Sequence, residues 1–592
     1  MSEWKQTAMG ADDGLDAVTL AVLQGRLEQI ADEMDATLFR SAFNPIIAEA
    51  HDASHGLYDR DTGDTLVQGK SGLPIFVGAM AFAVKTVIDK VARDGRLEAG
   101  DVFVFNDPYE GGTHLSDFKL VKPIFRGDEV YCYLASVGHW HDVGGNVPGN
   151  YNPVATESFQ EGMLIPPVKL YASGALRQDI VDIVQANSRL PGSLFGDLNG
   201  QVNALDLGEK RVHALLDEYG DSMVLNAMQE LRARAAKVMR SNIAELPDGT
   251  YSAEDWLDND GIEDKPLKIA LDIHVAGEHL TLDFSRTALA CAGPVNISRS
   301  TAIAACYVAL KHVFTDVPAN AGVLEPVDFV IPDGSLLDAT APRPVGGYTE
   351  TILRLIDVTF VALADAAPER VNGCAYGTIN ALSITGHRGD GSRWVMFSFF
   401  GGGHGGHPHG DGLNHGNAPI SMATIPPLEI LEAAYPVRFT KWALREDSGG
   451  PGAQRGGCGA IYEIELLEQQ AQAFLFGERG RYQPPGVVNG GSGASNRFFY
   501  PTDDGPQSPP MASKMVGIEL RRGQRVRLET PGGGGYGSAL RRDPTRVAED
   551  VRLGYISSDS ARQHYACVVS NAGELDRQAT DTLRDAYTET HA

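Results

Sequence analysis

The sequence predicts an α+β protein: a mixed α/β N-terminal unit, then a β-rich, glycine-rich unit and a short C-terminal helical hairpin. Three observations support this class. Apolar residues recur at helical spacing near the N-terminus, strand-like alternation begins after Pro247, and glycines gather in runs from about residue 395 to 540. Because 592 residues exceed what one hydrophobic core normally supports, we expect domains at 1–245, 246–540 and 541–592.

The N-terminal unit should begin with an amphipathic helix between residues 16 and 43. Its apolar stripe consists of Leu20, Leu23, Leu27, Ile30, Met34 and Leu38. A β-hairpin, a second and more apolar helix, and two neighbouring buried strands are expected next, at 55–60 with 65–69, at 75–93, and at 101–107 with 131–137. The metal-bearing part of the N-terminal unit is expected among these elements.

The remaining elements follow from changes of periodicity. Helical patterns return over 175–243, and alternating strands follow at 267–275 and 279–284. Two helices interrupt this β-rich region, at 301–314 and 349–366. The C-terminal hairpin should consist of two helices within 543–569 that meet at Ser557 and Ser558, because serine caps helix N-termini well.

Composition excludes several classes of function. A formal net charge of −27 argues against nucleic acid and against an anionic membrane surface as partners. No stretch approaches eighteen consecutive apolar residues, and the acidic N-terminus lacks the apolar core of a signal peptide. The six cysteines are scattered singly, which is typical of reduced thiols. We therefore expect a cytoplasmic protein.

The segment 106–145 carries the most informative pattern. His114 and Asp117 lie three residues apart, and His139, His141 and Asp142 follow a short apolar segment. Imidazoles and carboxylates of this kind bind divalent metals such as Zn²⁺, Mn²⁺ or Fe²⁺. The alternative is that they are polar loop residues whose side chains bond their own backbone. Glycines on both sides of the segment permit the sharp turns that a metal site needs.

A fourth ligand could come from upstream. Asp52 precedes the first strand of the same unit, between His51 and His55, for which exposed loop positions are the simpler interpretation. Spacing alone does not decide whether His141 and Asp142 bind the metal, orient its ligands or transfer protons.

Other candidate motifs are weaker. The segment 404–415 contains four histidines and Asp411, but so many glycines indicate a loose backbone, and metal sites need firmly held ligands. Gly63 and the later Gly69, Lys70 and Ser71 resemble a phosphate-binding loop with one residue too many between the glycines. The sequence therefore does not predict ATP binding by this chain.

Several long motifs together resemble the hydantoinase B/5-oxoprolinase family. They occur in the family's order over nearly the whole chain: NDPYEGGTHLSD at 106–117, HDVGG at 141–145 with PGN at 148–150, QEGMLIPPVKLY at 160–171, YPVRFTKWALREDSGGPGAQRGG at 435–457 and ETPGGGGYG at 529–537. The resemblance strengthens the metal interpretation. It implies that the family's metal ligands correspond to His114, Asp117 and His139, with Asp52 as the matching upstream acid.

The resemblance also implies a division of labour. Members work in a hetero-oligomer with a hydantoinase A-type, actin-like ATPase subunit, which binds ATP and phosphorylates the substrate, while the B-type subunit supplies the metal-bearing site. Some members open cyclic amides such as hydantoins, 5-oxoproline or lactams, and related complexes carboxylate ketones such as acetone and acetophenone. This chain departs from the hydantoinase-like pattern His-His-Ala-Asp, because Trp140 and His141 lie between His139 and Asp142.

Three functions follow as hypotheses. The first is the catalytic B-type subunit of an ATP-dependent cyclic amidohydrolase, in which His141 or Asp142 accepts the proton of the attacking water. The second is a subunit of an ATP-dependent ketone carboxylase, in which the metal stabilises a developing enolate oxygen. The third is a non-catalytic scaffold subunit, for which loss of His114 would leave turnover intact.

Overall fold

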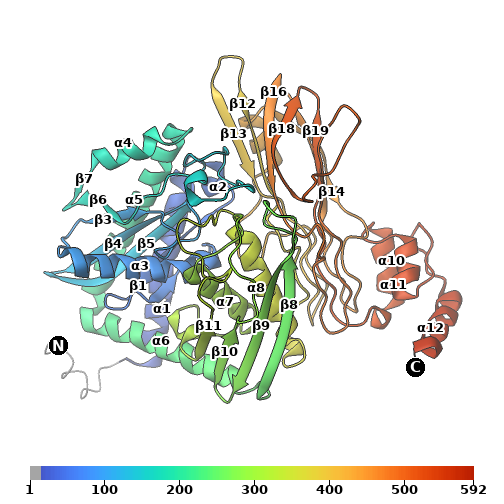
Figure 1. Ribbon diagram of the computed structural model, residues 1–592. Helices are drawn as coiled ribbons and strands as arrows, with labels where there is room; N and C mark the ends of the chain where they lie inside the picture. Colours follow the sequence, from blue (N-terminus) through green and yellow to red (C-terminus); the bar gives the residue numbers. More distant parts are fainter. Residues whose placement is uncertain (1–14, 592) are drawn as a thin grey trace.

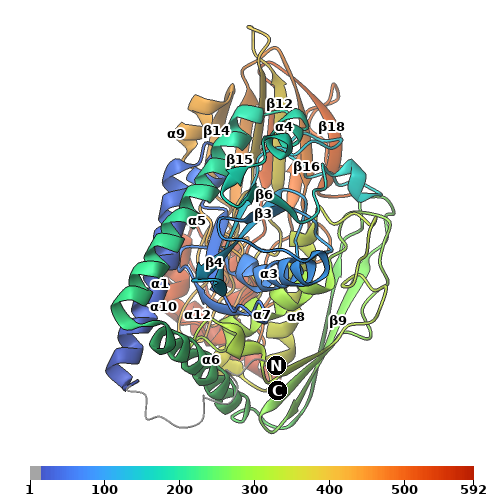
Figure 2. The same cartoon turned by 90° about the vertical axis from the view of Figure 1, so that its left-hand side faces the viewer.

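The structure, a computed structural model, describes residues 15–591. Residues 1–14, which belong to the segment where we expect no signal peptide, lie outside the described residues. The chain combines helices and sheets over its whole length, which confirms the α+β class (Figures 1 and 2). Whether the three predicted domains separate at 245 and 540 stays a prediction.

The N-terminal unit is built on a seven-stranded sheet in the order β2-β1-β5-β4-β3-β6-β7. The strands are β1 (Ala53–Tyr58), β2 (Thr65–Gln68), β3 (Val102–Phe105), β4 (Asp117–Arg126), β5 (Glu129–His139), β6 (Val168–Ala172) and β7 (Ala175–Leu176). All neighbouring strands run antiparallel. The predicted hairpin of β1 and β2 is confirmed.

Helices cover both faces of this sheet. The N-terminal helices are α1 (Ala17–Ser41), α2 (Pro45–Ala48), α3 (Pro74–Asp94), α4 (Gln178–Ala186), α5 (Pro191–Tyr219) and α6 (Asp221–Ile243). The apolar stripe of α1 is buried with α5 against one face, and α3 packs on the other face. Figure 2 shows α1 and α5 running side by side along the edge of the molecule.

The pairing of the central strands differs from the prediction. β3 and β5 are not neighbours, because β4 lies between them and pairs with both. The sequence pattern does not predict β4 as a strand, because Lys119, Lys122 and Pro123 interrupt the run of apolar residues. The segment 175–243 also begins with the short strand β7 and is helical only from Gln178.

A second layer follows on the α3 side of the sheet. Its elements are β8 (Gly249–Leu257), β9 (Leu267–Ala276), β10 (His279–Asp283), β11 (Val327–Val330), α7 (Arg299–Val313) and α8 (Tyr348–Leu363). α3 packs on α7, α7 packs on α8, and α8 packs on β8 and β9, so that one hydrophobic core joins the N-terminal unit to this layer (Figure 1). Short 3₁₀ helices lie at Ser158–Gln160, Ala321–Leu324, Pro368–Arg370 and Ala539–Arg541.

Two four-stranded sheets form a sandwich next. One sheet has the order β13-β12-β16-β18 and the other β14-β15-β19-β17. Their bounds are β12 (Ala381–His387), β13 (Arg393–Ser398), β14 (Val437–Leu444), β15 (Ala460–Leu466), β16 (Gln470–Phe476), β17 (Arg497–Phe499), β18 (Lys514–Arg521) and β19 (Arg525–Glu529), with α9 at Leu428–Ala434. Apolar residues of both sheets share a separate core.

The glycine-rich segments are packed, which makes the expectation of a loose backbone wrong. The three consecutive amides of 533–535 donate to the carbonyls of three different segments, at Gly457, Cys374 and Gly491. Successive amides that point in three different directions repeat every three residues, as in a polyproline II helix. In a β-strand, by contrast, successive residues alternate with a period of two. A Cβ added at Gly533 would lie 2.0 Å from the His404 carbonyl oxygen, so only glycine permits this bundle of extended segments.

The C-terminal segment contains the two predicted helices, α10 (Pro544–Arg552) and α11 (Ser558–Tyr565), and a third, α12 (Arg577–His591). These helices protrude from the body beyond the glycine bundle (Figure 1). All six cysteines are free thiols. Within residues 15–591, no helix combines the length and the apolar character needed to cross a membrane.

Candidate metal centre

Three side chains from two strands and one loop meet at one end of the seven-stranded sheet. Asp117 begins β4, His139 ends β5, and the two residues are register partners. His114 lies in the loop that leads into β4. The Nε2 atom of His114 lies 3.1 Å from Asp117 Oδ1, and His139 Nδ1 lies 3.3 Å from the same oxygen. The structure thus brings together the three residues that the sequence pattern singled out.

This donor set fits a divalent metal. One potential ligand atom from each residue lies within 4.8 Å of the others, and all three residues are buried. Asp117 Oδ1 is buried without a hydrogen-bond partner between the two imidazoles. Burial alone would raise the pKa of Asp117, but the two histidines outweigh burial and hold the pKa below its ordinary value. Two imidazole nitrogens and an ionised carboxylate suit Zn²⁺, Mn²⁺ or Fe²⁺.

Asp52 lies beside the triad. It directly precedes β1, which pairs with β5, and its carbonyl accepts the amide of His139 at 3.1 Å. Its Oδ2 atom lies 3.9 Å from His139 Nδ1, and its Oδ1 atom has no hydrogen-bond partner. Burial raises the pKa of Asp52 to about 7. The geometry therefore leaves Asp52 available as a further oxygen donor.

His141 and Asp142 have different surroundings. Both oxygens of Asp142 are engaged, because Oδ1 accepts the amides of Gly144 and Arg189 and Oδ2 accepts Arg189 Nη1 at 2.9 Å. His141 is buried, its Nε2 has no hydrogen-bond partner, and burial lowers its pKa to about 4. At neutral pH His141 is therefore an uncharged base, whereas Asp142 anchors the loop that follows β5.

Aromatic rings from distant segments enclose the triad. The His114 ring lies 4.9 Å from that of Tyr348 and 5.5 Å from that of Tyr151, and the His139 ring stacks on Phe397 at 5.6 Å. Sequence reasoning missed these three residues. Tyr348 begins α8 and Phe397 belongs to β13, so no local pattern connects them with the metal motif.

A small cavity adjoins the triad. It measures about 30 Å³, about the share of liquid volume that one water takes. Asp52 and His139 line it on one side. Its other walls are mostly apolar and include Leu73, Ile75 and Phe399. Because these walls come from three layers of the fold, the site depends on the N-terminal unit, α8 and the sandwich together.

One segment closes the cavity, and we name residues 417–424 the strap. Ala418 and Ile420 line the cavity from the strap. The strap contacts the N-terminal unit through Thr424, whose amide donates to the Ala50 carbonyl at 2.9 Å and whose Oγ1 donates to the Glu49 carbonyl at 2.7 Å. The Ile75 amide donates to the Ile420 carbonyl at 3.4 Å.

The histidines at 51, 55 and in the 404–415 segment lie outside this group. The Nδ1 atom of His55 lies 2.7 Å from Asp35 Oδ1 and both side chains are fully buried, so its interpretation as an exposed loop residue is wrong. His51 stacks on Phe39. In the 404–415 segment, His404 bonds the Asn417 backbone, and the structure does not bring its histidines together as a metal group within the described residues.

Trp140, at which the chain departs from the hydantoinase-like pattern, faces away from the site. Its ring stacks on Phe118 at 3.7 Å, and its Nε1 donates to Gln201 Oε1 at 2.9 Å. Both contacts belong to the core between the sheet and α5. The departure at Trp140 therefore carries no information about the substrate.

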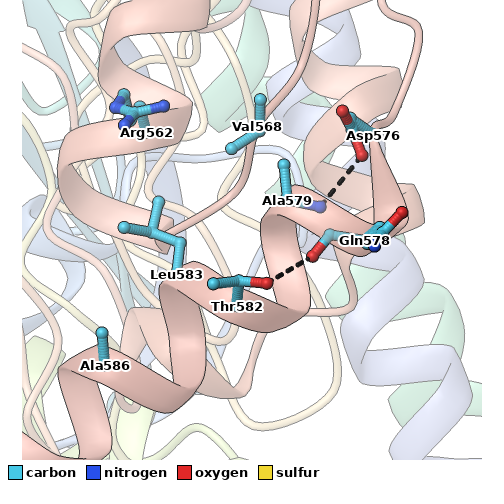
Figure 3. A pocket seen from close by; sticks show the side chains of 8 residues that line it. All are labelled: Arg562, Val568, Asp576, Gln578, Ala579, Thr582, Leu583 and Ala586. Atoms are coloured by element: carbon cyan, nitrogen blue, oxygen red, sulfur yellow. Dashed lines mark hydrogen bonds between the residues drawn. The ribbon is translucent and has the colours of Figure 1, made fainter.

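Larger hollows lie elsewhere. One of about 500 Å³ lies beside the β1–β2 turn and α3, and its Arg232 is paired with Asp64 and Glu325. A hollow of about 490 Å³ lies between α11 and α12, and Arg562 and Asp576 are its charged lining residues (Figure 3). Asp576 accepts the Ala579 amide at the start of α12. These residues offer no cluster of metal-binding or nucleophilic groups, so we place the candidate site at the triad.

Known proteins resemble this chain over nearly its whole length. The family model described as hydantoinase B/oxoprolinase matches residues 16–539. The beta subunit of caprolactamase from Pseudomonas jessenii is 33% identical to this chain, over 97% of this chain and 100% of the subunit. The matched region contains the triad, the cavity walls and the glycine bundle.

Solved structures share the fold. The crystal structure of the ATP-dependent caprolactamase from Pseudomonas jessenii superposes with a TM-score of 0.86 and 32% identity, covering 97% of this chain and 100% of that chain. A nucleotide-free structure of acetone carboxylase superposes with a TM-score of 0.87 and 21% identity, covering 98% of this chain and 83% of that chain. The second likeness establishes a common fold only.

Proposed function

The chain belongs to the hydantoinase B/oxoprolinase family, and from this membership we propose that it is the B-type catalytic subunit of an ATP-dependent enzyme that opens cyclic amides. One observation carries the proposal: the buried triad of His114, Asp117 and His139 borders a cavity that includes Asp52. A scaffold subunit has no need for imidazoles and carboxylates grouped beside a cavity.

The residues of this chain have distinct proposed roles. His114, Asp117 and His139 hold a divalent metal, and Asp52 supplies the further oxygen donor. When bound, the ion acts as a Lewis acid that polarises the substrate carbonyl and promotes ionisation of water. Tyr348 and Tyr151 pack against the imidazole of His114 and fix its orientation.

His141 is the proposed proton acceptor. Its ring is uncharged at neutral pH and its Nε2 atom has no hydrogen-bond partner. The side chain does not line the cavity, so we assign the proton a path through an intervening water. Asp142 is assigned a positioning role instead, because Arg189 and the backbone occupy both of its oxygens.

We propose that the partner is an A-type ATPase subunit, which binds ATP and phosphorylates the substrate. The name of the caprolactamase relative as a beta subunit supports a multi-subunit enzyme. The chain itself offers a near-match to a phosphate loop at Gly63 to Ser71, but those residues form the turn and second strand of the β1–β2 hairpin and its exit, and the next helix, α3, begins only at Pro74. ATP binding is therefore assigned to the partner.

The test is ring opening by the reconstituted complex. We expect ATP-dependent opening of a cyclic amide that is lost in His114→Ala, while the variant still co-purifies with its partner. His407→Ala, in a partly exposed histidine outside the site, is the matched control. Full turnover by His114→Ala would establish the scaffold alternative, and turnover of acetone with bicarbonate instead would establish the carboxylase alternative.

A further inference from the structure

Three buried polar atoms without partners belong to residues that line the cavity beside the triad. They are Asp52 Oδ1, His139 Nε2 and Thr349 Oγ1, and none of them has a hydrogen-bond partner among residues 15–591. Buried polar atoms are normally paired, because an unpaired one loses its hydration and gains nothing in return. Three such atoms around one small cavity indicate that they share a partner.

The cavity has the size of a single water molecule. Its volume of about 30 Å³ exceeds the roughly 10–15 Å³ that one water needs and is far below the roughly 300–1,000 Å³ of an ordinary ligand site. A buried water typically makes about three hydrogen bonds, and cavities that stay dry are lined by apolar atoms. The size and the three unpartnered atoms therefore both suit one water.

The other polar side chains of the cavity are less suited to bind it. Both polar atoms of the Asn417 amide are engaged, Nδ2 with the Ala423 carbonyl at 2.8 Å, and Ser421 Oγ accepts the Ala423 amide at 2.8 Å. The hydroxyl of Tyr151 lies near Thr349 but does not complete a hydrogen bond to it. The water site therefore lies on the side formed by the triad and the start of α8.

The three atoms offer a water both donors and acceptors. Asp52 Oδ1 is an acceptor, while the other oxygen, Oδ2, lies 3.9 Å from His139 Nδ1. When Nδ1 of His139 serves as a ligand atom, the proton of the neutral ring is on Nε2, which is then a donor. The hydroxyl of Thr349 can donate or accept. One water can thus donate to Asp52, accept from His139 and pair with Thr349 in either sense.

Thr349 is the one of these three residues that is outside the proposed ligand set. It is 4% exposed and is the second residue of α8, a helix that packs on α7, β8 and β9. A group on a packed helix is held more precisely than a group on a loop. The N-terminal end of this 16-residue helix also favours negative charge on a nearby water oxygen.

We propose that the cavity binds one water molecule and that the hydroxyl of Thr349 orients it beside His139 and Asp52. The binding of this water follows from the cavity and its unpartnered atoms. Its part in the reaction rests on the proposed function, in which it is the water that ring opening consumes. Thr349 then contacts a reacting molecule without being a metal ligand.

A high-resolution crystal structure of the wild-type complex tests the water site directly. We expect one ordered water within hydrogen-bond distance of Thr349 Oγ1 and Asp52 Oδ1. Thr349→Val keeps the branched shape and removes the hydroxyl, so this water should be lost or displaced, whereas Thr349→Ser should retain it. A wild-type cavity without ordered water, or a water that stays in place in Thr349→Val, would overturn the proposal.

Turnover tests the orienting role. We expect kcat for ring opening to fall about 100-fold in Thr349→Val, because a misplaced reacting atom costs about that much, while KM and metal content change little. Thr349→Ser should restore most of the rate. Thr359→Val is the control, since the buried Thr359 hydroxyl donates to the Leu355 carbonyl of the same helix at 2.7 Å, and it should keep the wild-type kcat. An unchanged kcat in Thr349→Val would overturn the assignment of Thr349.

The two measurements separate this inference from the proposed function. A wild-type complex that holds the water but opens no cyclic amide with ATP would contradict the proposed function and leave the water site standing. Ring opening by a complex whose cavity is dry would contradict the water site and leave the function standing. The wild-type structure decides the water site even if Thr349→Val fails to fold.

Discussion

Asp117 and His139 are register partners across β4 and β5, and their ligand atoms Oδ1 and Nδ1 lie 3.3 Å apart. Directly opposed residues of an antiparallel pair project from the same face of the sheet at a spacing that the ladder fixes. Two of the three residues of the triad are thus held by a rigid pair of strands, and only His114 depends on a loop. A metal site made in this way needs little reorganisation to bind its ion.

The first prediction concerns Asp117. Asp117→Asn keeps the shape of the side chain and removes the charge that faces both imidazoles, so we expect metal content to fall from near one ion per chain to a small fraction. Ring opening should fall by a factor of at least about 100, because loss of a first ligand exceeds the roughly 10–100-fold effect of outer-shell changes. Elemental analysis of the purified complex measures the first effect.

Asp206→Asn is the control for this change. Asp206 lies on α5 with 58% of its side chain exposed, and it forms an ion pair with Lys122, which lies on β4 as Asp117 does. Its loss should leave metal content and activity unchanged. Equal metal in Asp117→Asn and wild type would remove the triad as a metal centre.

Much of this centre can be predicted from the sequence, because its three residues belong to one short segment. His114, Asp117 and His139 lie within 26 residues, in a segment where glycine turns alternate with apolar runs. The strand β4 cannot be predicted from the sequence, because Lys119 and Lys122 are charged residues in positions that a buried strand would fill with apolar ones. Lys122 is buried in an ion pair with residues of α5, a partner that only the tertiary structure reveals.

The walls of the site cannot be predicted from the sequence either, because they come from distant segments of the chain. Tyr348, Phe397 and Ile420 lie more than two hundred residues beyond the triad, and their local patterns indicate an ordinary helix, strand and loop. The prediction of a loose backbone in the glycine runs is wrong because glycine is flexible only where no neighbouring segment restrains it. In this fold each glycine run is held by the others.

The second prediction tests that glycine packing. In Gly533→Ala the new methyl group would meet the backbone of His404, which cannot move without breaking the bundle, so we expect a loss of more than about 3 kcal/mol in stability. Gly25→Ala is the matched change in a helix with open space around it, and it should stabilise by roughly 0.5–1 kcal/mol. Thermal unfolding of both variants measures the difference. Similar midpoints for the two would contradict the account of the bundle.

The third prediction is a pH dependence that arises from Asp197. This carboxyl on α5 is buried, accepts the amides of Phe43 and Asn44, and has its pKa raised by burial to about 7. Between about pH 4 and pH 7 the folded chain keeps a proton that the unfolded chain releases, so stability decreases as pH rises, by up to about 4 kcal/mol. Asp197→Asn should flatten this part of the stability curve.

Denaturant unfolding at pH 5 and pH 8 checks the slope. The exposed Asp182 on α4 is the control, and Asp182→Asn should retain the wild-type dependence. Part of the slope should remain in Asp197→Asn, because burial also raises the pKa of Asp52 to about 7 and those of Glu161 and Glu350 to about 8. A slope equal to that of the wild type would contradict the contribution of Asp197.

The fourth prediction separates positioning from catalysis at Asp142. Arg189→Met removes the guanidinium that pairs with the buried carboxylate and keeps most of the side-chain length. We expect a loss of about 2 kcal/mol, because the carboxylate is left with backbone donors only. Metal content should stay at the wild-type level. Loss of metal with unchanged stability would instead place Asp142 in direct contact with the ion.

The fifth prediction concerns Asp52, which could serve as a ligand or as a proton carrier. Asp52→Asn preserves the side-chain volume and removes the charge that lies 3.9 Å from His139 Nδ1. If Asp52 is a ligand, the variant should hold its metal more weakly by about 10-fold or more and lose activity in proportion. If Asp52 carried protons only, metal affinity would be unchanged while the rate fell.

Competition with a chelator of known affinity distinguishes these outcomes, since it measures metal affinity without turnover. The adjacent His51 offers the control. Its ring stacks on Phe39 away from the triad, and its φ of 61° is one that asparagine tolerates. His51→Asn should therefore keep both metal and activity. Weakened metal binding in Asp52→Asn but not in His51→Asn would establish the carboxylate as the fourth donor, whereas equal affinity in all three proteins would leave His114, Asp117 and His139 as the complete protein ligand set.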